Sequence, residues 1–491
     1  MPKPDHKGPP AEIVDHLIDV HEANGTLDRL LESGIGDIVQ ARLQPQPTAF
    51  MSGQTVNGWQ PWTWDGGTTV TLLPGMDPAL ALSDSGSFGG FIEYNGVLYF
   101  TATDPATGYE LRSFDGTSVS LVQDLYSGSA SSQAGRFGFA EFNGSLYFAA
   151  DDGSHGLELH SFDGTSISMV ANINPGSQPS DAGAYGGFVV FGDALYFTAT
   201  DRVNGFELRR FDGNSVTLVD DLKAGFGSSN PGQYGGFVEF DGALYFSASG
   251  ADGVELHMFD GTDITQVADL NSGSRSSLPG RHGGFIEFNG ALYFTASDGI
   301  TGNELRRFDG TTISLVEDIY SGPASSSAGL YGFVEFDGAL YFTAFDPVNG
   351  FALRRFDGAD VSLVDDAGMG LSNAGLIGGF TVFDGDLYFN AHDPLYGHEL
   401  RRLDGETGVI ETFDFLPGPG DSNAQVLGIV NGSLAVGAWI DEIGDGAADR
   451  YAMLAASGSP LGLEDFQFVN GGGGPFEPGT QFYVSDAELL S

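Results

Sequence analysis

The tripeptide Leu-Tyr-Phe recurs at a nearly fixed interval along most of the chain, and this repeat constrains the fold more than any other feature. Successive copies lie 47–49 residues apart. Their leucines are Leu98, Leu146, Leu195, Leu244, Leu292, Leu340 and Leu387, and a degenerate copy begins at Leu434. A period of roughly 20–50 residues is typical of repeat architectures such as solenoids and propellers. We therefore expect one large repeat domain, although a chain of 491 residues ordinarily forms several domains.

Each repeat contains four strand-like runs separated by turn signals. In the first full copy the runs are GGFIEY (89–94), VLYFTATD (97–104), YELRSFD (109–115) and SVSLVQDL (118–125). Asn95-Gly96 and Asp115-Gly116 connect the first run to the second and the third to the fourth. Asn-Gly and Asp-Gly between apolar runs are strong hairpin signals, because both central residues of a type I′ turn need a positive φ. The pattern predicts four antiparallel strands per repeat.

Four strands in about 48 residues are the signature of a propeller blade, so we predict an all-β fold. Runs such as LYFTA are apolar on both faces, which suits blades packed between neighbouring blades. Residues 62–73 match the last two strands of a repeat, and Val426–Val430 with Ser433–Trp439 match the first two. Joining these halves predicts an eight-bladed propeller closed by a split blade, with a seven-bladed ring as the alternative.

The two ends of the chain differ from the repeat. Residues 1–57 are predicted to form a short N-terminal helical hairpin within 11–43, followed by a linker. The propeller is expected over 58–460, and 461–491 form a C-terminal tail. The tail ends in SDAELLS (485–491), which resembles the uncleaved signals of type I secreted proteins. The N-terminus lacks the apolar core of a secretory signal peptide. We therefore expect an extracellular or cell-surface protein exported without such a peptide, with the cytoplasm as the alternative.

The charge balance excludes some partners. The chain carries 66 acidic and 19 basic residues, for a formal net charge of −47. Such a surface repels nucleic acid and anionic membranes, and it attracts cations. No run of about 18 apolar residues is present, so the sequence predicts no membrane insertion.

The third strand and its turn resemble a known repeat family. Tyr109-Glu110-Leu111 through Asp115-Gly116-Thr117 is similar to the ELWxxDGT repeats of bacterial surface and secreted proteins, as is GSHGLELHSFDGT at 153–165. The resemblance covers about four-fifths of the chain. It departs at the Trp of the motif, which Arg or His replaces in the full copies, while the partial first copy keeps it as Trp62. The resemblance implies an exported repeat scaffold without a common reaction.

An up-and-down blade places its tight turns on one face of the ring, here called the turn face. Its loops between the second and third strands, and between blades, lie on the opposite loop face. Loops on a rigid scaffold commonly carry function, so a protein or glycan ligand is expected on the acidic loop face.

The loop face also carries the candidate metal ligands. Its loops have the form D-x₃-G-x-E-L, and Ca²⁺ prefers six to eight hard oxygen ligands. The candidate ligands are Asp104, Glu110, Asp152, Glu158, Asp201, Glu207, Asp298, Glu304, Asp393 and Glu399, with Asp441, Asp445 and Asp449 in the last repeat. Inter-blade loops add Asp124, Asp221, Asp269, Asp318 and Asp366. In the alternative interpretation, each Asp bonds its own turn and each Glu pairs with the Arg two residues later.

The sequence contains no catalytic signature that stands out from the repeat. It has no HExxH motif and no G-x-S-x-G elbow, and its nine His are scattered. We therefore expect a non-enzymatic binding or adhesion scaffold stabilised by calcium. There are two alternatives. One is a carbohydrate-active propeller enzyme, either a hydrolase or a lyase, that uses loop-face carboxylates. The other is an assembly component docked by its N-terminal helices.

Overall fold

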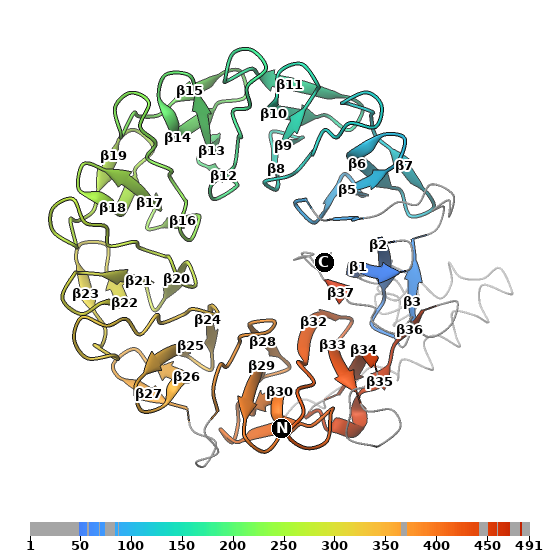
Figure 1. The fold of residues 1–491 in the computed structure, drawn as a ribbon, viewed down its shortest axis with the longest axis vertical. Helices are drawn as coiled ribbons and strands as arrows, with labels where there is room; N and C mark the ends of the chain where they lie inside the picture. Colours follow the sequence, from blue (N-terminus) through green and yellow to red (C-terminus); the bar gives the residue numbers. More distant parts are fainter. Residues whose placement is uncertain are drawn as a thin grey trace, which may run out of the picture.

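The structure, a computed structural model, is a ring of β-sheets arranged around a common centre (Figure 1). It describes residues 49–55, 58–67, 69–73, 84–86, 88–364, 371–440, 450–458, 460–471 and 482–483. The predicted helical hairpin, Asp366, the Asp441–Asp449 cluster and the tail signal lie outside these residues. Within them the chain forms nine sheets and one short 3-10 helix, η1 (Leu463–Asp465). No helix in the described part is long and apolar enough to cross a membrane.

Seven sheets follow the repeat, and each is a four-stranded antiparallel meander. Their strands are β4 (Phe91–Tyr94), β5 (Val97–Asp104), β6 (Gly108–Phe114) and β7 (Val119–Leu121); β8 (Phe139–Phe142), β9 (Ser145–Asp151), β10 (Leu157–Phe162) and β11 (Ile167–Ala171); β12 (Phe188–Phe191), β13 (Ala194–Asp201), β14 (Gly205–Phe211) and β15 (Val216–Leu218); β16 (Phe237–Phe240), β17 (Ala243–Gly250), β18 (Gly253–Phe259) and β19 (Ile264–Gln266); β20 (Phe285–Phe288), β21 (Ala291–Ser297), β22 (Asn303–Phe308) and β23 (Ile313–Leu315); β24 (Phe333–Phe336), β25 (Ala339–Asp346), β26 (Gly350–Phe356) and β27 (Val361–Leu363); and β28 (Phe380–Phe383), β29 (Asp386–Asp393), β30 (Gly397–Leu403) and β31 (Ile410–Phe413). The first strand of each lies nearest the centre of the ring (Figure 1).

The two remaining sheets correct the predicted blade count. The eighth sheet contains β32 (Gln425–Val430), β33 (Ser433–Ile440), β34 (Arg450–Ser457) and β35 (Gln467–Phe468). The ninth contains β1 (Ala49–Thr55), β2 (Gly58–Trp64), β3 (Thr69–Leu72), β36 (Asn470–Gly471) and β37 (Phe482–Tyr483). The predicted halves therefore belong to two neighbouring sheets. The expectation of eight or seven blades is wrong for the described residues, and so is the expected joining of 62–73 with 426–439, because β34 and β35 complete the eighth sheet. A sheet shared by the two ends of the chain does form, since the ninth joins β1–β3 to β36 and β37.

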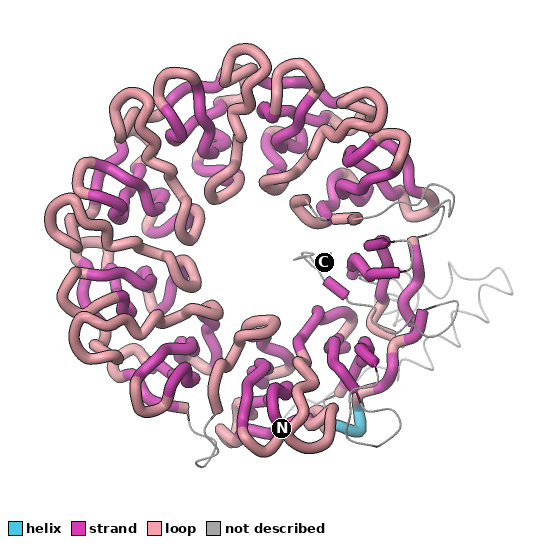
Figure 2. Tube along the Cα trace, viewed as in Figure 1, coloured by secondary structure: helices cyan, strands magenta, loops and turns pink. Residues whose placement is uncertain are grey.

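The ring closes through pairing and packing between the chain ends. β36 pairs in parallel with β3, and β37 pairs antiparallel with β1. Trp64 and Val70 of the ninth sheet form one buried cluster with Leu427, Val430 and Met453 of the eighth. Loops and strands alternate around the whole ring (Figure 2).

The Leu-Tyr-Phe strands form the core between sheets, as the two-sided apolar pattern predicts. Tyr293 and Leu305 of one sheet pack in one cluster with Leu340 and Phe342 of the next. Phe342 is completely buried. Full burial of one such side chain contributes about 1.5–3 kcal/mol relative to leaving it exposed.

The two kinds of hairpin turn differ in conformation. Asn95 and Gly96 both have positive φ (54° and 74°), as a type I′ turn requires. At the second turn only Gly116 has a positive φ. Asp115 there accepts the backbone N–H groups of Thr117 and Ser118, both at 2.8 Å. The side chain therefore builds the second turn, which joins β6 to β7, and a type I′ turn does not form there.

Candidate functional site

The predicted Asp ligands of the loop face have structural partners. Their Oδ1 atoms accept the N–H groups two and three residues later, as in Asp201 with Val203 and Asn204, both at 2.7 Å. The same turn forms at Asp104, Asp152, Asp298 and Asp393. This confirms that each Asp bonds its own turn.

Four of the five predicted Glu ligands are followed two residues later by an Arg, and that Arg pairs with the Asp instead of the Glu. Arg209 meets Asp201 at 2.6 Å, and Arg306 meets Asp298 at 3.2 Å. The same pairs join Arg112 to Asp104 and Arg401 to Asp393. The expected Glu–Arg pair is therefore wrong at these positions. Each Arg lies on the strand that follows the loop, and its side chain reaches the Asp at the start of the loop on the preceding strand.

The predicted Glu ligands are buried and fasten the loops between sheets. Glu158 accepts the N–H groups of Ile173 (2.9 Å) and Asn174 (3.2 Å), and Glu207 accepts that of Ser229 (2.9 Å). Glu110, Glu304 and Glu399 make equivalent bonds. Burial raises the pKa of these carboxyl groups, to about 7 for Glu158, Glu207 and Glu304 and to about 8 for Glu399.

The Asp of each loop thus bonds its own turn, whereas the Glu bonds backbone N–H groups of the loop between sheets. The structure does not bring the two carboxylates together as a metal site. Among the described residues, no group of three or more His, Asp or Glu could hold a metal ion. The inter-blade loops do contain oxygen atoms that are buried without a hydrogen-bond partner: Oδ1 of Asp124, Asp221, Asp318 and Asp414. Calcium binding and a ligand on the loop face stay predictions.

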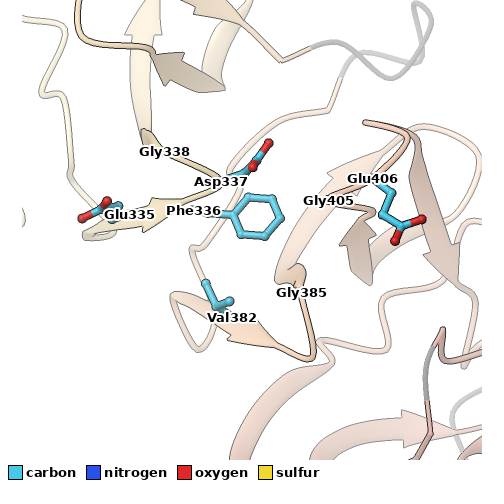
Figure 3. Close-up of a pocket in the computed structure, with 8 residues that line it drawn as sticks. All are labelled: Glu335, Phe336, Asp337, Gly338, Val382, Gly385, Gly405 and Glu406. Atoms are coloured by element: carbon cyan, nitrogen blue, oxygen red, sulfur yellow. The ribbon is translucent and has the colours of Figure 1, made fainter. Parts of the chain in front are cut away.

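A different acidic site lies on the turn face, between the β24–β27 and β28–β31 sheets. A pocket of about 580 Å³ is lined by Glu335, Phe336, Asp337, Gly338, Val382, Gly385, Gly405 and Glu406. In the view of Figure 3, Phe336 lies between Glu335 and Glu406. The three carboxylate side chains are exposed, and none of the lining residues is basic. We call this the acidic pocket.

The turn from β30 to β31, which lines the acidic pocket, is longer than its counterparts. Six residues separate the paired Leu403 and Ile410, whereas four separate Phe211 and Val216 in the β12–β15 sheet. The added residues carry Glu406 to the pocket.

Two buried charged residues hold this longer turn. Asp386 accepts the N–H of Gly405 at 3.0 Å and lies 3.5 Å from Arg402. Arg402 also donates to Glu411 at 2.8 Å and to the carbonyl oxygen of Leu461 at 3.1 Å. These contacts anchor the turn, so that the position of Glu406 is fixed by the sheet below it.

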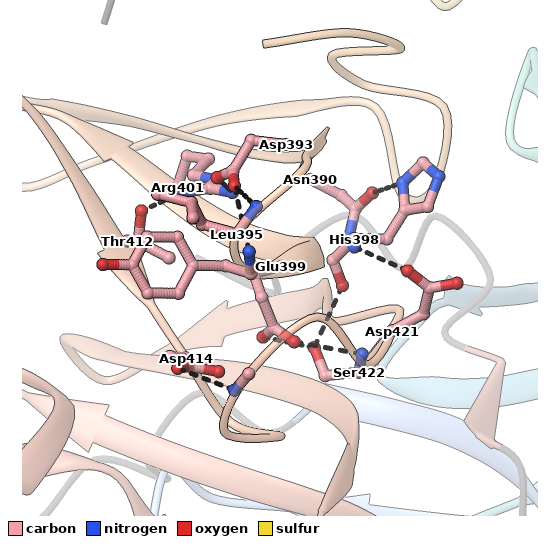
Figure 4. A network of polar contacts seen from close by, with 12 residues as sticks. Asn390, Asp393, Leu395, His398, Glu399, Arg401, Thr412, Asp414, Asp421 and Ser422 are labelled. Carbon is pink, nitrogen blue, oxygen red and sulfur yellow. Dashed lines mark hydrogen bonds and ion pairs between the residues drawn. The ribbon is translucent and has the colours of Figure 1, made fainter. Parts of the chain in front are cut away.

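The opposite end of the β28–β31 sheet also departs from the repeat. Figure 4 shows His398, Asn390 and Asp421 beside the Glu399–Ser422 contact. The Nδ1 of His398 lies 3.3 Å from Oδ1 of Asn390, and Oδ1 of Asp421 accepts the N–H of His398 at 2.8 Å. In the β12–β15 sheet the equivalent residues are Phe206, Thr198 and Ser228.

Sequence reasoning missed both ends of this sheet. The signal was visible in the DGETG turn at 404–408 and in the Asp386, Asn390 and His392 of the DLYFNAH run, where other repeats have ALYFTAT or ALYFSAS. These changes fall at several positions, each of which looks like ordinary variation of the repeat.

Comparison with known proteins gives no family. No protein-family model matches the chain, and no curated protein matches it. The similarity to ELWxxDGT repeats therefore stays a prediction.

Several solved structures are distantly similar to this chain. One is a mutant puromycin hydrolase in complex with PGG, with 14% identity, 71% of this chain and 58% of that chain covered, and a TM-score of 0.34. Another is a puromycin-hydrolysing peptidase of Mycobacterium tuberculosis, with 12% identity, coverage of 76% and 59%, and a TM-score of 0.34. A third comes from a study of two prolyl endopeptidases, with 13% identity, coverage of 75% and 54%, and a TM-score of 0.35. The chain thus spans less than two-thirds of each matched chain.

These matches correct one expectation. They are enzymes, which contradicts the non-enzymatic adhesion scaffold expected from the sequence, and we do not retain that function. Because the TM-scores lie below 0.5, the likeness assigns no particular activity to this chain.

Proposed function

We propose that the protein binds a partner protein or peptide through a basic side chain that enters the acidic pocket. The observation that carries this proposal is the lining: three exposed carboxylates and no basic residue. A Lys or Arg inserted there would bring the charge complement that the lining lacks.

The apolar part of the lining suits the stem of such a side chain. Phe336 is buried, and Val382 is 41% exposed where the equivalent inner-strand residues Glu239, Glu287 and Glu335 are acidic. Lys and Arg bury their methylene groups against apolar surface while their charged ends stay among polar groups. The pocket therefore favours a long cationic side chain over a small inorganic cation.

The proposal is tested by fluorescence anisotropy with a labelled oligolysine peptide. Its lysine-acetylated form is the ligand control. Glu406→Gln should weaken binding about fivefold, as expected for the loss of roughly 1 kcal/mol from one ion pair at a partly exposed site. Glu335→Gln should act in the same direction, and acetylation should abolish binding.

The chain offers a matched control for the high net charge. Glu239 occupies the same FVEFDG sequence as Glu335, but it faces a four-residue turn and Glu287 instead of Val382. Glu239→Gln should leave affinity nearly unchanged. If it weakens binding as much as Glu406→Gln does, the peptide is held by overall charge and the pocket has no special role.

A further inference from the structure

The loop-face end of the β28–β31 sheet carries a pair of histidines that the other repeats lack. His392 on β29 is directly opposite His398 on β30. The equivalent pair is Thr200–Phe206 in the β12–β15 sheet and Phe345–Phe351 in the β24–β27 sheet. The fold therefore accepts non-histidine pairs at this place, and it does not need imidazoles for stability.

Backbone hydrogen bonds show which type of cross-strand pair the two histidines form. His392 exchanges both its backbone bonds with Ser372, each at 2.9 Å. His398 donates its N–H to Asp421 at 2.8 Å and accepts the N–H of Asn423 at 3.0 Å. The backbone groups of both histidines thus point away from each other. They form a non-hydrogen-bonded pair, the kind in which facing side chains approach most closely. Their ring centroids are 4.9 Å apart.

Asn390 selects the tautomer of His398. The Nδ2 of Asn390 donates to the carbonyl oxygen of Ala424 at 2.9 Å, which orients the amide and leaves Oδ1 facing Nδ1 of His398 at 3.3 Å. Nδ1 must therefore carry the proton, and the lone pair belongs to Nε2. A second group that fixes the ring and tautomer in this way is typical of metal-binding histidines.

Asn390 does this without losing the structural role of its position. Thr198 occupies the same place in the β12–β15 sheet and donates to the carbonyl oxygen of Pro231 at 2.7 Å. The bond from Asn390 to Ala424 is its equivalent. The contact with His398 is thus an addition to the repeat.

We propose that His392 and His398 bind one divalent transition-metal ion of the kind that imidazole prefers, such as Zn²⁺, Ni²⁺ or Cu²⁺. The protein supplies two nitrogen ligands, and water completes the coordination. This site is independent of the acidic pocket, which lies at the other end of the same sheet. It also differs from the expected calcium sites, whose ligands are oxygens.

The test is Cu²⁺ titration of the full-length protein, followed by electron paramagnetic resonance. His392→Thr and His398→Phe introduce the residues of the β12–β15 sheet, and each should remove one bound ion and its two-nitrogen signal. His257→Arg is the control, because His257 lies at the repeat's Arg position, and it should change neither.

Asn390→Thr gives a second measurement that a fold defect would not mimic. It introduces the Thr that four of the other six repeats carry at this position and leaves both imidazoles in place, so it should weaken the same site by about 10-fold or more. If both His variants melt as the wild type does and keep all bound ions, the proposal is wrong. It is equally wrong if Asn390→Thr binds Cu²⁺ with unchanged affinity.

Discussion

The β28–β31 sheet and the β12–β15 sheet share one architecture but differ in what their polar positions do. In the β12–β15 sheet, Thr198 and Ser228 only fasten the chain, by bonds to a carbonyl oxygen and a backbone N–H. In the β28–β31 sheet, Asn390 and Asp421 make the same bonds, and Asn390 adds one to His398. A repeat can thus gain new chemistry at positions where the replacement keeps the old bond.

The largest expected effect concerns what the two sheets have in common. Phe197 and Phe389 are equivalent and almost completely buried, at 0% and 1% exposure. Truncating either to Ala should lower the free energy of unfolding by about 3–5 kcal/mol, because each leaves a cavity between sheets. Chemical denaturation followed by fluorescence measures this. A loss below about 1 kcal/mol for Phe389→Ala alone would show that the β28–β31 sheet is packed differently.

The next largest effect compares two ion-paired aspartates, the buried Asp386 of the β28–β31 sheet and the exposed Asp193 of the β12–β15 sheet. Asp386→Ala removes a buried partner of Arg402 and of the Gly405 N–H, and it should lower the free energy of unfolding by about 1–3 kcal/mol. It should also weaken oligolysine binding by displacing Glu406. Asp193 pairs with Arg210, but the side chain of Asp193 is 93% exposed. Asp193→Ala should therefore lower the free energy of unfolding by less than about 0.5 kcal/mol. Equal effects in thermal melts would argue against the anchoring role of Asp386.

A smaller difference should appear in the pH dependence of the melting temperature. Burial raises the pKa of Glu399 to about 8 and that of Glu207 to about 7, both above the usual value near 4.3. A raised pKa means that the folded state holds the proton more tightly than the unfolded state. The stabilisation is therefore complete below about pH 4 and is lost as the pH rises through 7 to 8.

Glutamine variants isolate that contribution in each sheet. Glu399→Gln should flatten the fall of melting temperature between mildly acidic and mildly alkaline pH, and its effect should extend to higher pH than that of Glu207→Gln. Each variant also loses an acceptor, so the slope with pH is the quantity to compare. A wild-type melting temperature that rises over this range would contradict the assignment.

The smallest expected effect is that of calcium. Asp221 and Asp414 are equivalent inter-blade residues of the two sheets, and Oδ1 of each is buried without a hydrogen-bond partner. If Ca²⁺ binds there, adding it should raise the melting temperature by a few degrees, since a ligand of the folded state stabilises it. Asp221→Asn and Asp414→Asn should each reduce the increase. An unchanged melting temperature with and without chelator would reject calcium at both positions.

The sequence predicts the repeated part of the fold well, because local chemistry determines it. Asn95-Gly96 adopts the positive φ angles that its residue types favour, and the Leu-Tyr-Phe strands are buried on both faces. The closure was harder to predict. Strand β1 reads AFMSGQT, without a clear period-two pattern, and β36 and β37 contain two residues each. Strands this short or irregular can be identified only once the strands that they pair with are known.

The candidate site was only partly predictable, for a related reason. The sequence identifies the Asp and Glu of the loops as unusual, but burial and cross-strand contacts decide their partners, as with Glu158 and Arg209. The acidic pocket depends on Asp386 meeting Gly405 across a sheet, a pairing that no motif records. The His392–His398 pair required the register of β29 and β30.

The ninth sheet also sets an order of events during synthesis. Strand β1 is made early, but its partner β37 begins at Phe482, more than 400 residues later. The seven repeat sheets have only local contacts between neighbours, so each can form as soon as its own residues leave the ribosome. In the ninth sheet, β1, β2 and β3 also pair locally, but the two outer strands β36 and β37 are made last. A ribosome stalled before residue 470 would therefore carry the ninth sheet without β36 and β37, and both edges of that sheet would stay unpaired.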